Sequence, residues 1–260
     1  MAVSAPDPVP LALCEDDLAA PGVIEPSVVH RRRALSPRAV ICFFNEVLAD
    51  LERSGRATVV DEMVSEIGRN PIYEVATNAG PVTAFHPGVG APLAAACFEE
   101  AIAYGCTHFV ACGGAGALLE ELVLGHPIIV TSAVRDEGTS FHYLPPGRVV
   151  EADPNGVAVL QAVLDEAQVT YVTGRTWTTD ALYRETRARV NRRVAEGCVV
   201  VEMEAAAFMA VARYRGVSFA QLLYAGDSLA GAQWDERHWM GDRSGRAALF
   251  DLAAEAALRL

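Results

Sequence analysis

Three acidic side chains follow two short apolar segments in the last third of the chain, in a spacing that suits chemistry on a sugar and a heterocycle. Glu202 and Glu204 flank Met203 directly after one apolar run, and Asp227 follows the next one. Open α/β sheets bind ligands outside the carboxyl ends of their strands, so we expect two adjacent strands to deliver these acids to one pocket. Carboxylates accept both hydrogens of a vicinal diol, methionine offers a soft apolar face, and an aspartic acid can protonate a leaving base.

A structural role for these acids competes with that interpretation. A glutamate at a junction between a strand and a helix often caps the helix or interacts favourably with its dipole. One such residue alone would favour the cap. Because Glu202 and Glu204 lie two positions apart and Asp227 follows the next predicted strand, the set favours a functional site.

Alternating periodicities predict the elements that position the acids. Strands are predicted over 39–44, 72–76, 82–85, 107–112, 127–134, 169–173, 198–201 and 217–224, and helices over 45–54, 91–104, 157–167, 180–195, 205–214 and 243–259. This order predicts an α/β fold with one mixed, mostly parallel sheet flanked by helices on both faces. Residues 39–260 form the predicted single domain, and the Pro-rich residues 1–38 form an irregular N-terminal arm. The long loop 135–154 is expected to carry function.

Composition excludes several classes of protein. The chain has 260 residues, of which 52% are hydrophobic, and a net charge of −12 that argues against nucleic acid as the main partner. No apolar run approaches the roughly 18–20 residues that span a bilayer, and the N-terminus lacks the basic start of a signal peptide. A cytoplasmic protein without membrane association is therefore expected. The six cysteines form no Cys-x-x-Cys pair, so we expect reduced thiols and no metal site.

Two glycine segments add to the predicted site. Gly88 and Gly90 form a turn before a helix, and Gly113, Gly114 and Gly116 form a loop after a strand. Backbone amides in such segments can cradle an anion or let a sugar approach closely. Each segment is equally consistent with a tight turn that needs a positive φ. Together with the acids, the glycines indicate a pocket at the strand ends.

From about residue 84 onward the chain resembles the nucleoside phosphorylase-I superfamily, which includes uridine and purine nucleoside phosphorylases and the methylthioadenosine/adenosylhomocysteine nucleosidases. The matching pieces follow the family's order: 88–90, 113–117, 136–143, 178–183, 201–206 and Asp227. Residues 1–83 match poorly. The resemblance implies a nucleoside phosphorylase-like fold, a small-molecule nucleoside as substrate, no cofactor, and phosphate as a possible co-substrate. It also implies a homo-oligomer, either a dimer or a hexamer.

The resemblance assigns roles to individual residues. Glu204 resembles the acceptor of the ribose diol, Met203 the residue under the sugar, and Glu202 a neighbour that supports the sugar site. Asp227 resembles the acid of the purine-cleaving branches, which hydrogen-bonds the base and helps to protonate it. The remaining predicted substrate-binding residues are Gly88, Gly113, Gly114, Thr179, Asp180, Leu182, Tyr183, His142 and Tyr143. Leu182 falls where relatives carry an aromatic ring against the base, for which Tyr183 or Trp177 is a candidate substitute. His142 and Tyr143 are expected to close over the sugar or over a neighbouring subunit's site.

The nucleophile stays open between phosphate and water. Ala111 and Gly114 stand where phosphorylases carry an arginine and a hydroxyl residue for phosphate, and the loss of a bidentate arginine removes a strong contact. Nucleosidases also lack that arginine, because water is their nucleophile. Their N-terminal glutamate base has three candidates here, Glu15, Glu25 and Glu46. The candidates for a replacement arginine are Arg31, Arg32, Arg33, Arg135 and Arg175.

The predicted function is therefore enzymatic cleavage of the N-glycosidic bond of a nucleoside, with a purine or purine-like base favoured. Phosphorolysis and hydrolysis both fit, through an oxocarbenium-like transition state. Two alternatives are glycosyl transfer to another acceptor in specialised metabolism and a non-catalytic nucleoside-binding protein on the same fold. The segment 234–239, with a tryptophan at each end, is interpreted as packed in preference to forming a lid.

Overall fold

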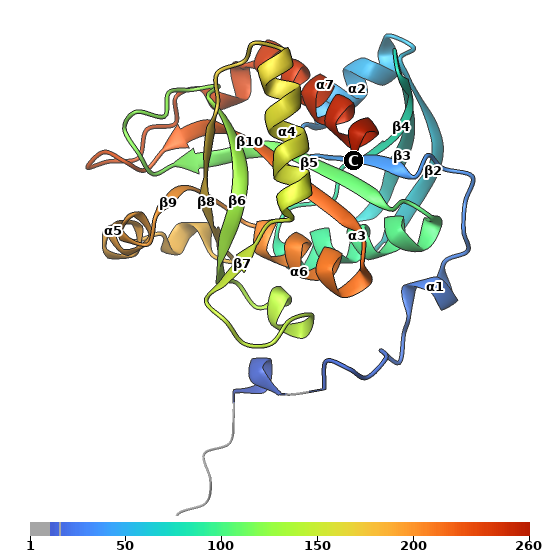
Figure 1. Cartoon of the computed structure of the whole chain (residues 1–260), viewed down its shortest axis with the longest axis horizontal. Helices are drawn as coiled ribbons and strands as arrows, with labels where there is room; N and C mark the ends of the chain where they lie inside the picture. Colours follow the sequence, from blue (N-terminus) through green and yellow to red (C-terminus); the bar gives the residue numbers. More distant parts are fainter. Residues whose placement is uncertain (1–10, 16) are drawn as a thin grey trace, which may run out of the picture.

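A computed structural model describes residues 11–15 and 17–260 (Figure 1). In this part of the chain one sheet of ten strands forms the centre of the molecule. The strands are β1 (Arg38–Cys42), β2 (Ala57–Ser65), β3 (Gly68–Thr77), β4 (Gly80–Phe85), β5 (His108–Ala117), β6 (Pro127–Asp136), β7 (Val149–Glu151), β8 (Val172–Thr179), β9 (Cys198–Glu202) and β10 (Ser218–Ser228). The predicted α/β fold with a mixed sheet is confirmed.

Strand β5 is the centre of this sheet. It pairs with β1 and β10 in parallel, and its last residues pair with Val200 and Val201 of β9 in antiparallel orientation. The pairings from β5 through β9, β8 and β6 return to β5 by way of β10, so this half of the sheet rolls closed. The expectation that β9 and β10 are neighbours is wrong, since β5 lies between them.

Helices cover both faces of the sheet. They are α2 (Asn45–Arg53), α3 (Ala91–Tyr104), α4 (Pro154–Glu166), α5 (Arg187–Ala195), α6 (Ala205–Arg215) and α7 (Arg243–Arg259). Helices α3 and α6 pack on one face around Phe98 and Phe208, and α4 and α7 pack on the other around Leu160 and Phe250 (Figure 1). The rings of Phe98 and Phe208 meet edge to face at 5.5 Å, an arrangement that stabilises the first of these layers.

Strand β2 and the predicted helix 180–195 differ from the sequence prediction. Strand β2 was not predicted, because most of its side chains are exposed at the sheet edge and its polar residues mask the strand pattern. The predicted helix 180–195 divides into a 3-10 turn, Leu182–Arg184, and α5. Extended backbone at Thr186 breaks it, and the Thr186 hydroxyl then caps α5 by accepting from the Arg189 amide at 3.4 Å.

The predicted N-terminal arm is irregular where the structure describes it. It contains a 3-10 turn, Ala12–Cys14, and the short helix α1 (Pro26–Val29). Glu25 of the arm pairs with Arg215 of α6 at 3.0 Å, and Arg33 pairs with Asp61 of β2 at 2.9 Å. Residues 1–10 and 16 of the arm lie outside the described part, and its boundary at residue 38 stays a prediction.

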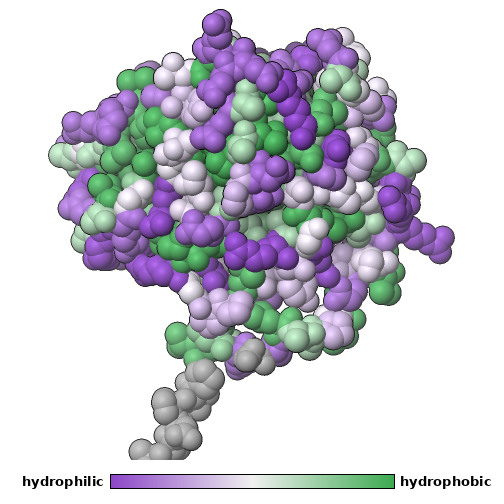
Figure 2. Space-filling model, in the orientation of Figure 1, coloured by the Kyte–Doolittle hydropathy of each residue, from purple (hydrophilic) through white to green (hydrophobic). Residues whose placement is uncertain are grey.

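The surface is mixed in character. Figure 2 shows hydrophilic residues interspersed with smaller apolar areas on the face seen in Figure 1. Within residues 11–15 and 17–260, no helix combines the length and the hydrophobicity that a bilayer-spanning segment requires.

A buried arginine orders the long loop between β6 and β7. The Arg135 guanidinium donates to the Ser140 hydroxyl at 2.8 Å and to the carbonyls of Pro145 and Leu144 at 2.7 and 3.2 Å. It also lies 4.2 Å from the centre of the Phe141 ring. Arg135 therefore holds the loop in place, and its donors are used within the loop.

Replacing Arg135 by methionine should destabilise the protein, because it leaves several buried acceptors without a donor. We expect the free energy of unfolding, measured with urea, to fall by about 2–4 kcal/mol. The matched control is Arg148→Met, which removes the exposed ion pair with Glu196 and should change stability by less than about 1 kcal/mol. Equal effects of the two substitutions would contradict the assignment of Arg135 as the residue that orders the loop.

Candidate active site

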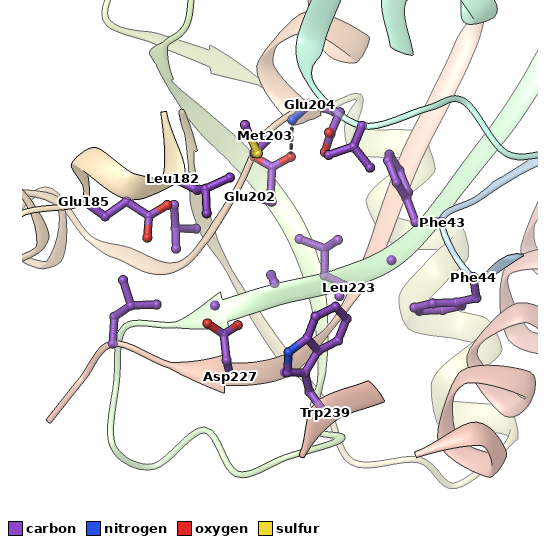
Figure 3. Close-up of a pocket in the computed structure, with 18 of the residues that line it drawn as sticks. Phe43, Phe44, Leu182, Glu185, Glu202, Met203, Glu204, Leu223, Asp227 and Trp239 are labelled. Atoms are coloured by element: carbon purple, nitrogen blue, oxygen red, sulfur yellow. Dashed lines mark hydrogen bonds between the residues drawn. The ribbon is translucent and has the colours of Figure 1, made fainter. Parts of the chain in front are cut away.

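A pocket of about 710 Å³ opens where β5, β9 and β10 end (Figure 3). The predicted residues that line it are Gly113, Gly114, Leu182, Tyr183, Glu202, Met203, Glu204 and Asp227. The other lining residues are Phe43, Phe44, Val89, Ala115, Gly116, Glu185, Val201, Gln221, Leu223, Gly226, Leu229, Trp234, Trp239 and Arg246. The structure therefore brings the three acids identified from the sequence into one cavity, while their roles stay predictions.

The glycines of β5 form one wall of the pocket. They belong to a regular strand, so the expectation of a loop after residue 112 is wrong. A Cβ atom on Gly114 would lie 3.1 Å from the Tyr224 ring, and one on Gly116 would lie 2.7 Å from Leu229. Side chains of neighbouring segments occupy the space over this strand, so glycine is needed here for close approach and not for a positive φ.

Glu204 is a buried acid with one oxygen held in place. It precedes α6, is 5% exposed, and its Oε1 accepts a hydrogen bond from the Gly90 amide at 2.6 Å. Burial and the neighbouring Glu202 carboxylate raise the pKa of Glu204 to about 8. Its second oxygen is left to accept from a ligand such as a diol.

The turn that supplies the Gly90 amide needs its glycines. Gly88 and Gly90 have φ values of +80° and +94°, which side chains rarely adopt, and a Cβ on Gly88 would lie 2.2 Å from Leu93. Gly88 itself does not line the pocket, whereas Val89 does. The contribution of Gly88 is therefore to shape the turn that orients Glu204.

Glu202 combines the two roles weighed for it. Its Oε2 accepts from the backbone amides of Glu204 at 2.8 Å and Ala205 at 2.6 Å, which caps the start of α6. Its Oε1 accepts from the hydroxyls of Thr178 at 2.6 Å and Thr176 at 3.3 Å. Burial raises the pKa of Glu202. Because both oxygens are engaged, Glu202 supports the site by holding the backbone on which Glu204 sits.

Asp227 receives a hydrogen bond from a tryptophan that the sequence interpretation placed in a packed segment. Trp234 Nε1 donates to Asp227 Oδ2 at 2.6 Å, and Trp234 is 61% exposed. Trp239, at the other end of the same segment, lies with its ring 5.0 Å from the Arg246 guanidinium. Both tryptophans therefore line the pocket: Trp239 does so while packed against Arg246, and Trp234 does so from an exposed position.

Glu185 is a pocket acid that sequence reasoning missed. It lines the cavity on the same side as Asp227, and both carboxyl groups point inward (Figure 3). Burial and the Asp227 carboxylate raise the pKa of Glu185 to about 7. The predicted continuous helix 180–195 hid this residue, since only the break at Thr186 turns Glu185 toward the cavity.

Arg246 of α7 was also missed, because its partners come from distant parts of the chain. It is 5% exposed and forms an ion pair with Glu46 of α2. Its Nε donates to the Tyr224 hydroxyl at 3.0 Å and its Nη2 to the Trp239 carbonyl at 3.2 Å. The guanidinium therefore joins the two helices to the end of β10 at one side of the pocket.

Gln221 of β10 is a buried polar residue in the pocket wall. It is 1% exposed, and its Oε1 has no hydrogen-bond partner among the described residues. A buried acceptor without a donor costs roughly 1–3 kcal/mol of stability. In the parallel pairing of β10 with β5, Gln221 stands beside Ala111, the position at which the resemblance expects an arginine.

Several predicted residues lie outside the pocket. The Thr179 hydroxyl accepts from the Ala181 amide at 3.3 Å, and Asp180 accepts from the Gly138 amide at 2.9 Å, so both hold backbone. His142 is exposed on a 3-10 turn, and Tyr143 packs 5.5 Å from the Tyr214 ring. None of these four lines the pocket: Thr179 and Asp180 are bonded to backbone amides, and the β6–β7 loop, which carries His142 and Tyr143, docks on α6. A role of His142 and Tyr143 in a neighbouring subunit's site stays a prediction.

The arginines considered as phosphate ligands are also placed elsewhere. Arg135 holds its loop, and Arg175 donates to the Ser132 hydroxyl at 2.9 Å and the Glu196 carbonyl at 2.8 Å. Neither these two nor Arg31, Arg32 and Arg33 line the pocket.

Comparison with known families gives this geometry a context. The sequence model described as "Phosphorylase superfamily" matches residues 37–256. The chain belongs to this superfamily. Its members include nucleoside phosphorylases and nucleosidases, and this chain is an enzyme of that family.

Three relatives show the range of this phosphorylase superfamily. A guanosine phosphorylase from Halorubrum lacusprofundi is 28% identical over 156 residues, which are 60% of this chain and 65% of that protein. The match thus spans just under two thirds of that relative's length. The structure of a uridine phosphorylase from Vibrio fischeri superposes with a TM-score of 0.73 at 21% identity, over 91% of this chain and 98% of that chain. An AMP nucleosidase from Bacteroides thetaiotaomicron superposes with a TM-score of 0.69 at 20% identity, over 85% and 87%. These two structures establish the shared fold.

Replacing Glu204 by glutamine should make this phosphorylase superfamily member more resistant to alkaline pH. The pKa of Glu204 is about 8 in the folded chain against an ordinary value of 4.5. The stability that comes from keeping Glu204 protonated is fully present below the pKa of Glu204 in the unfolded chain. It is lost as pH rises through the pKa of Glu204 in the folded chain. Glutamine removes this loss, so we expect the gain in stability to be larger near pH 9 than near pH 5, by a few kcal/mol at most, since one pKa unit is about 1.4 kcal/mol.

Thermal unfolding of the variant and the parent at both pH values measures this difference. Glu120→Gln, at an exposed carboxylate that forms no ion pair among the described residues, is the control and should show no such pH dependence. A shift in Tm that is the same at both pH values for Glu204→Gln would mean that Glu204 is already ionised in the folded protein.

Proposed function

We propose that this protein cleaves the N-glycosidic bond of a nucleoside with a purine-like base. The observation that carries the proposal is the presence of Asp227 and Glu204 in one pocket, with Met203 and Leu223 also in its wall (Figure 3). One carboxyl group suits a leaving base and the other a sugar diol. The apolar side chains suit the faces of the ribose ring.

The sugar is held at the Glu204 end. Because Gly90 fixes one carboxylate oxygen, the other is oriented to accept hydrogen bonds from the vicinal hydroxyls. A Glu204 that loses its proton on binding the diol places negative charge next to the developing oxocarbenium ion. The cleft wall of Met203 and Phe43 excludes water from the ring faces.

The base leaves at the Asp227 end. Asp227 lies beside Glu185, and burial favours the protonated form of Glu185 near neutral pH. This pair of acids can hold one proton between them and pass it to the nitrogen of the departing base. Trp234 keeps the Asp227 carboxyl oriented through its Nε1 hydrogen bond. A relative named guanosine phosphorylase supports the preference for a purine.

Asp227→Asn should abolish most of the turnover, because asparagine cannot donate the proton that the base needs. We expect kcat for the best purine nucleoside to fall by roughly 10²–10⁴-fold, the usual size of a general acid contribution. Release of free base, followed by liquid chromatography, measures this rate. Asp251→Asn on the exposed face of α7 is the control and should keep full activity. Unchanged turnover in Asp227→Asn would refute the assigned acid.

Glu185→Gln should change the pH profile. If protonated Glu185 supplies the shared proton, kcat/KM of the parent falls as pH rises through about 7, the pKa of Glu185. Glutamine does not titrate, so this alkaline limb should disappear while the rate at low pH decreases. Initial rates measured across the pH range test this, with the exposed Glu120→Gln as the control that keeps the parental profile. The same inflection in Glu185→Gln would assign the limb to another group.

A further inference from the structure

A histidine outside the pocket contacts both segments that shape its Glu204 end. His86 follows β4, is partly buried, and does not itself line the cavity. Its ring meets the Phe43 ring edge to face, with 5.8 Å between the ring centres. Its Nδ1 accepts a hydrogen bond from the Gly88 amide at 2.9 Å. His86 therefore touches Phe43, which lines the cavity, and the turn whose Gly90 amide binds Glu204.

The hydrogen bond from Gly88 requires a neutral imidazole. A ring nitrogen that accepts from an amide carries no proton, so the proton of His86 is on Nε2. Burial lowers the pKa of His86, against the opposing effects of the Phe43 carbonyl and the Glu46 carboxylate. The histidine thus serves the turn as a fixed acceptor.

The turn transmits this contact to Glu204. Gly88 and Gly90 have φ values of +80° and +94°, and glycine enters or leaves this region at little cost, so the turn needs partners to fix it. The Gly88 amide is bonded to His86, and the Gly90 amide is bonded to Glu204. The backbone of His86 is held in turn by Asn70 of β3, whose Nδ2 donates to the His86 carbonyl. These contacts aim the Gly90 amide at the Glu204 carboxyl group.

Ring packing connects His86 to the same glutamate by a second route. The Phe43 ring lies 6.3 Å from the Phe208 ring of α6, and the Phe208 amide donates to the Glu204 carbonyl at 3.0 Å. A Cβ atom on Gly113 would lie 3.0 Å from the Phe43 ring, so this ring is held closely against β5. A substitution at His86 must therefore be designed to separate the hydrogen bond from the packing.

We propose that His86 positions Glu204 for the vicinal diol of ribose and so sets the preference of the site for sugars that carry both hydroxyl groups. This inference rests on the proposed cleavage of a nucleoside. Without the Nδ1 acceptor the turn relaxes, and Glu204 loses the Gly90 amide that fixes its Oε1. The other carboxyl oxygen then has no fixed direction toward the diol. His86 is a positioning residue, since it acts through the turn from outside the cavity.

The preference for the diol is the quantity to measure. Guanosine, inosine and adenosine are compared for release of free base, and the best substrate is then compared with its 2′,3′-dideoxy form. The diol preference is the ratio of kcat/KM for the first to kcat/KM for the second, and we expect the parent to favour the ribonucleoside. Cleavage of none of the three nucleosides would refute the proposed function, and this inference with it. Cleavage without any diol preference would overturn this inference and leave N-glycosidic cleavage intact.

Leucine and asparagine at position 86 separate the hydrogen bond from the packing. The two side chains branch alike, but only asparagine has an acceptor, its Oδ1, at the bonded distance from the backbone that Nδ1 has in histidine. In His86→Leu the diol preference should fall roughly 10-fold, as expected for a lost hydrogen bond that orients a charged group. Its kcat/KM for the dideoxy substrate should stay close to the parental value. His86→Asn should keep the parental preference, although it loses the same ring.

The matched control is a second partly exposed histidine. His108 Nδ1 is hydrogen-bonded to the Thr107 hydroxyl at 2.9 Å, but His108 begins β5 at the end away from the pocket glycines. His108→Leu should keep the parental diol preference. An unchanged preference in His86→Leu, or an equal loss of activity toward both substrates, would overturn the positioning role. A loss of preference in His86→Asn as large as in His86→Leu would overturn the route through Nδ1.

Discussion

The close approach of side chains to the glycine-containing half of β5 is the constraint on which the site depends. This strand pairs with β1, β9 and β10, so it joins the open part of the sheet to the part that rolls closed. Tyr224 and Leu229 lie against Gly114 and Gly116 where any Cβ would crowd them. Bulkier residues here would push β10 away and separate Asp227 from the acids that follow β9.

The geometry at the end of β9 gives two nearby glutamates different tasks. Strand alternation would place residues two apart on one face, but the strand ends at Glu202, and Glu204 has φ −137° and ψ −28° at the start of α6. Glu202 therefore turns back to the helix amides and the threonines of β8. Glu204 is left with a single backbone partner and a free oxygen in the pocket. Glu202 fixes the backbone by capping the helix, and Glu204 keeps one oxygen free to accept a hydrogen bond from a ligand.

Such a site is costly to fold, and the surrounding layers offset the cost. Glu202, Glu204 and Glu185 all have a raised pKa, mainly because burial disfavours the charged form, and Gln221 has an unpaired carbonyl. The aromatic cluster of Phe98, Phe109 and Phe208 and the alanine-rich face of α7 provide the apolar burial that holds these groups in place. An acceptor left free in a well-packed frame, as in Glu204, is typical of binding sites, where a ligand completes it.

The sequence by itself determined the α/β alternation, the bounds of helices 91–104 and 243–259, and the position of Glu202, Glu204 and Asp227 at strand ends. These features depend on local periodicity, helix capping and turn formation, which are determined by residues close together in the sequence. Only the tertiary structure decided that β5 lies between β9 and β10 and that Glu185, Gln221, Trp234 and Arg246 belong to the pocket. Arg246 meets Glu46 across 200 positions of the chain, and Gln221 meets Ala111 only through strand pairing. Such contacts form when layers distant in the sequence pack together, so hydrophobic periodicity does not predict them.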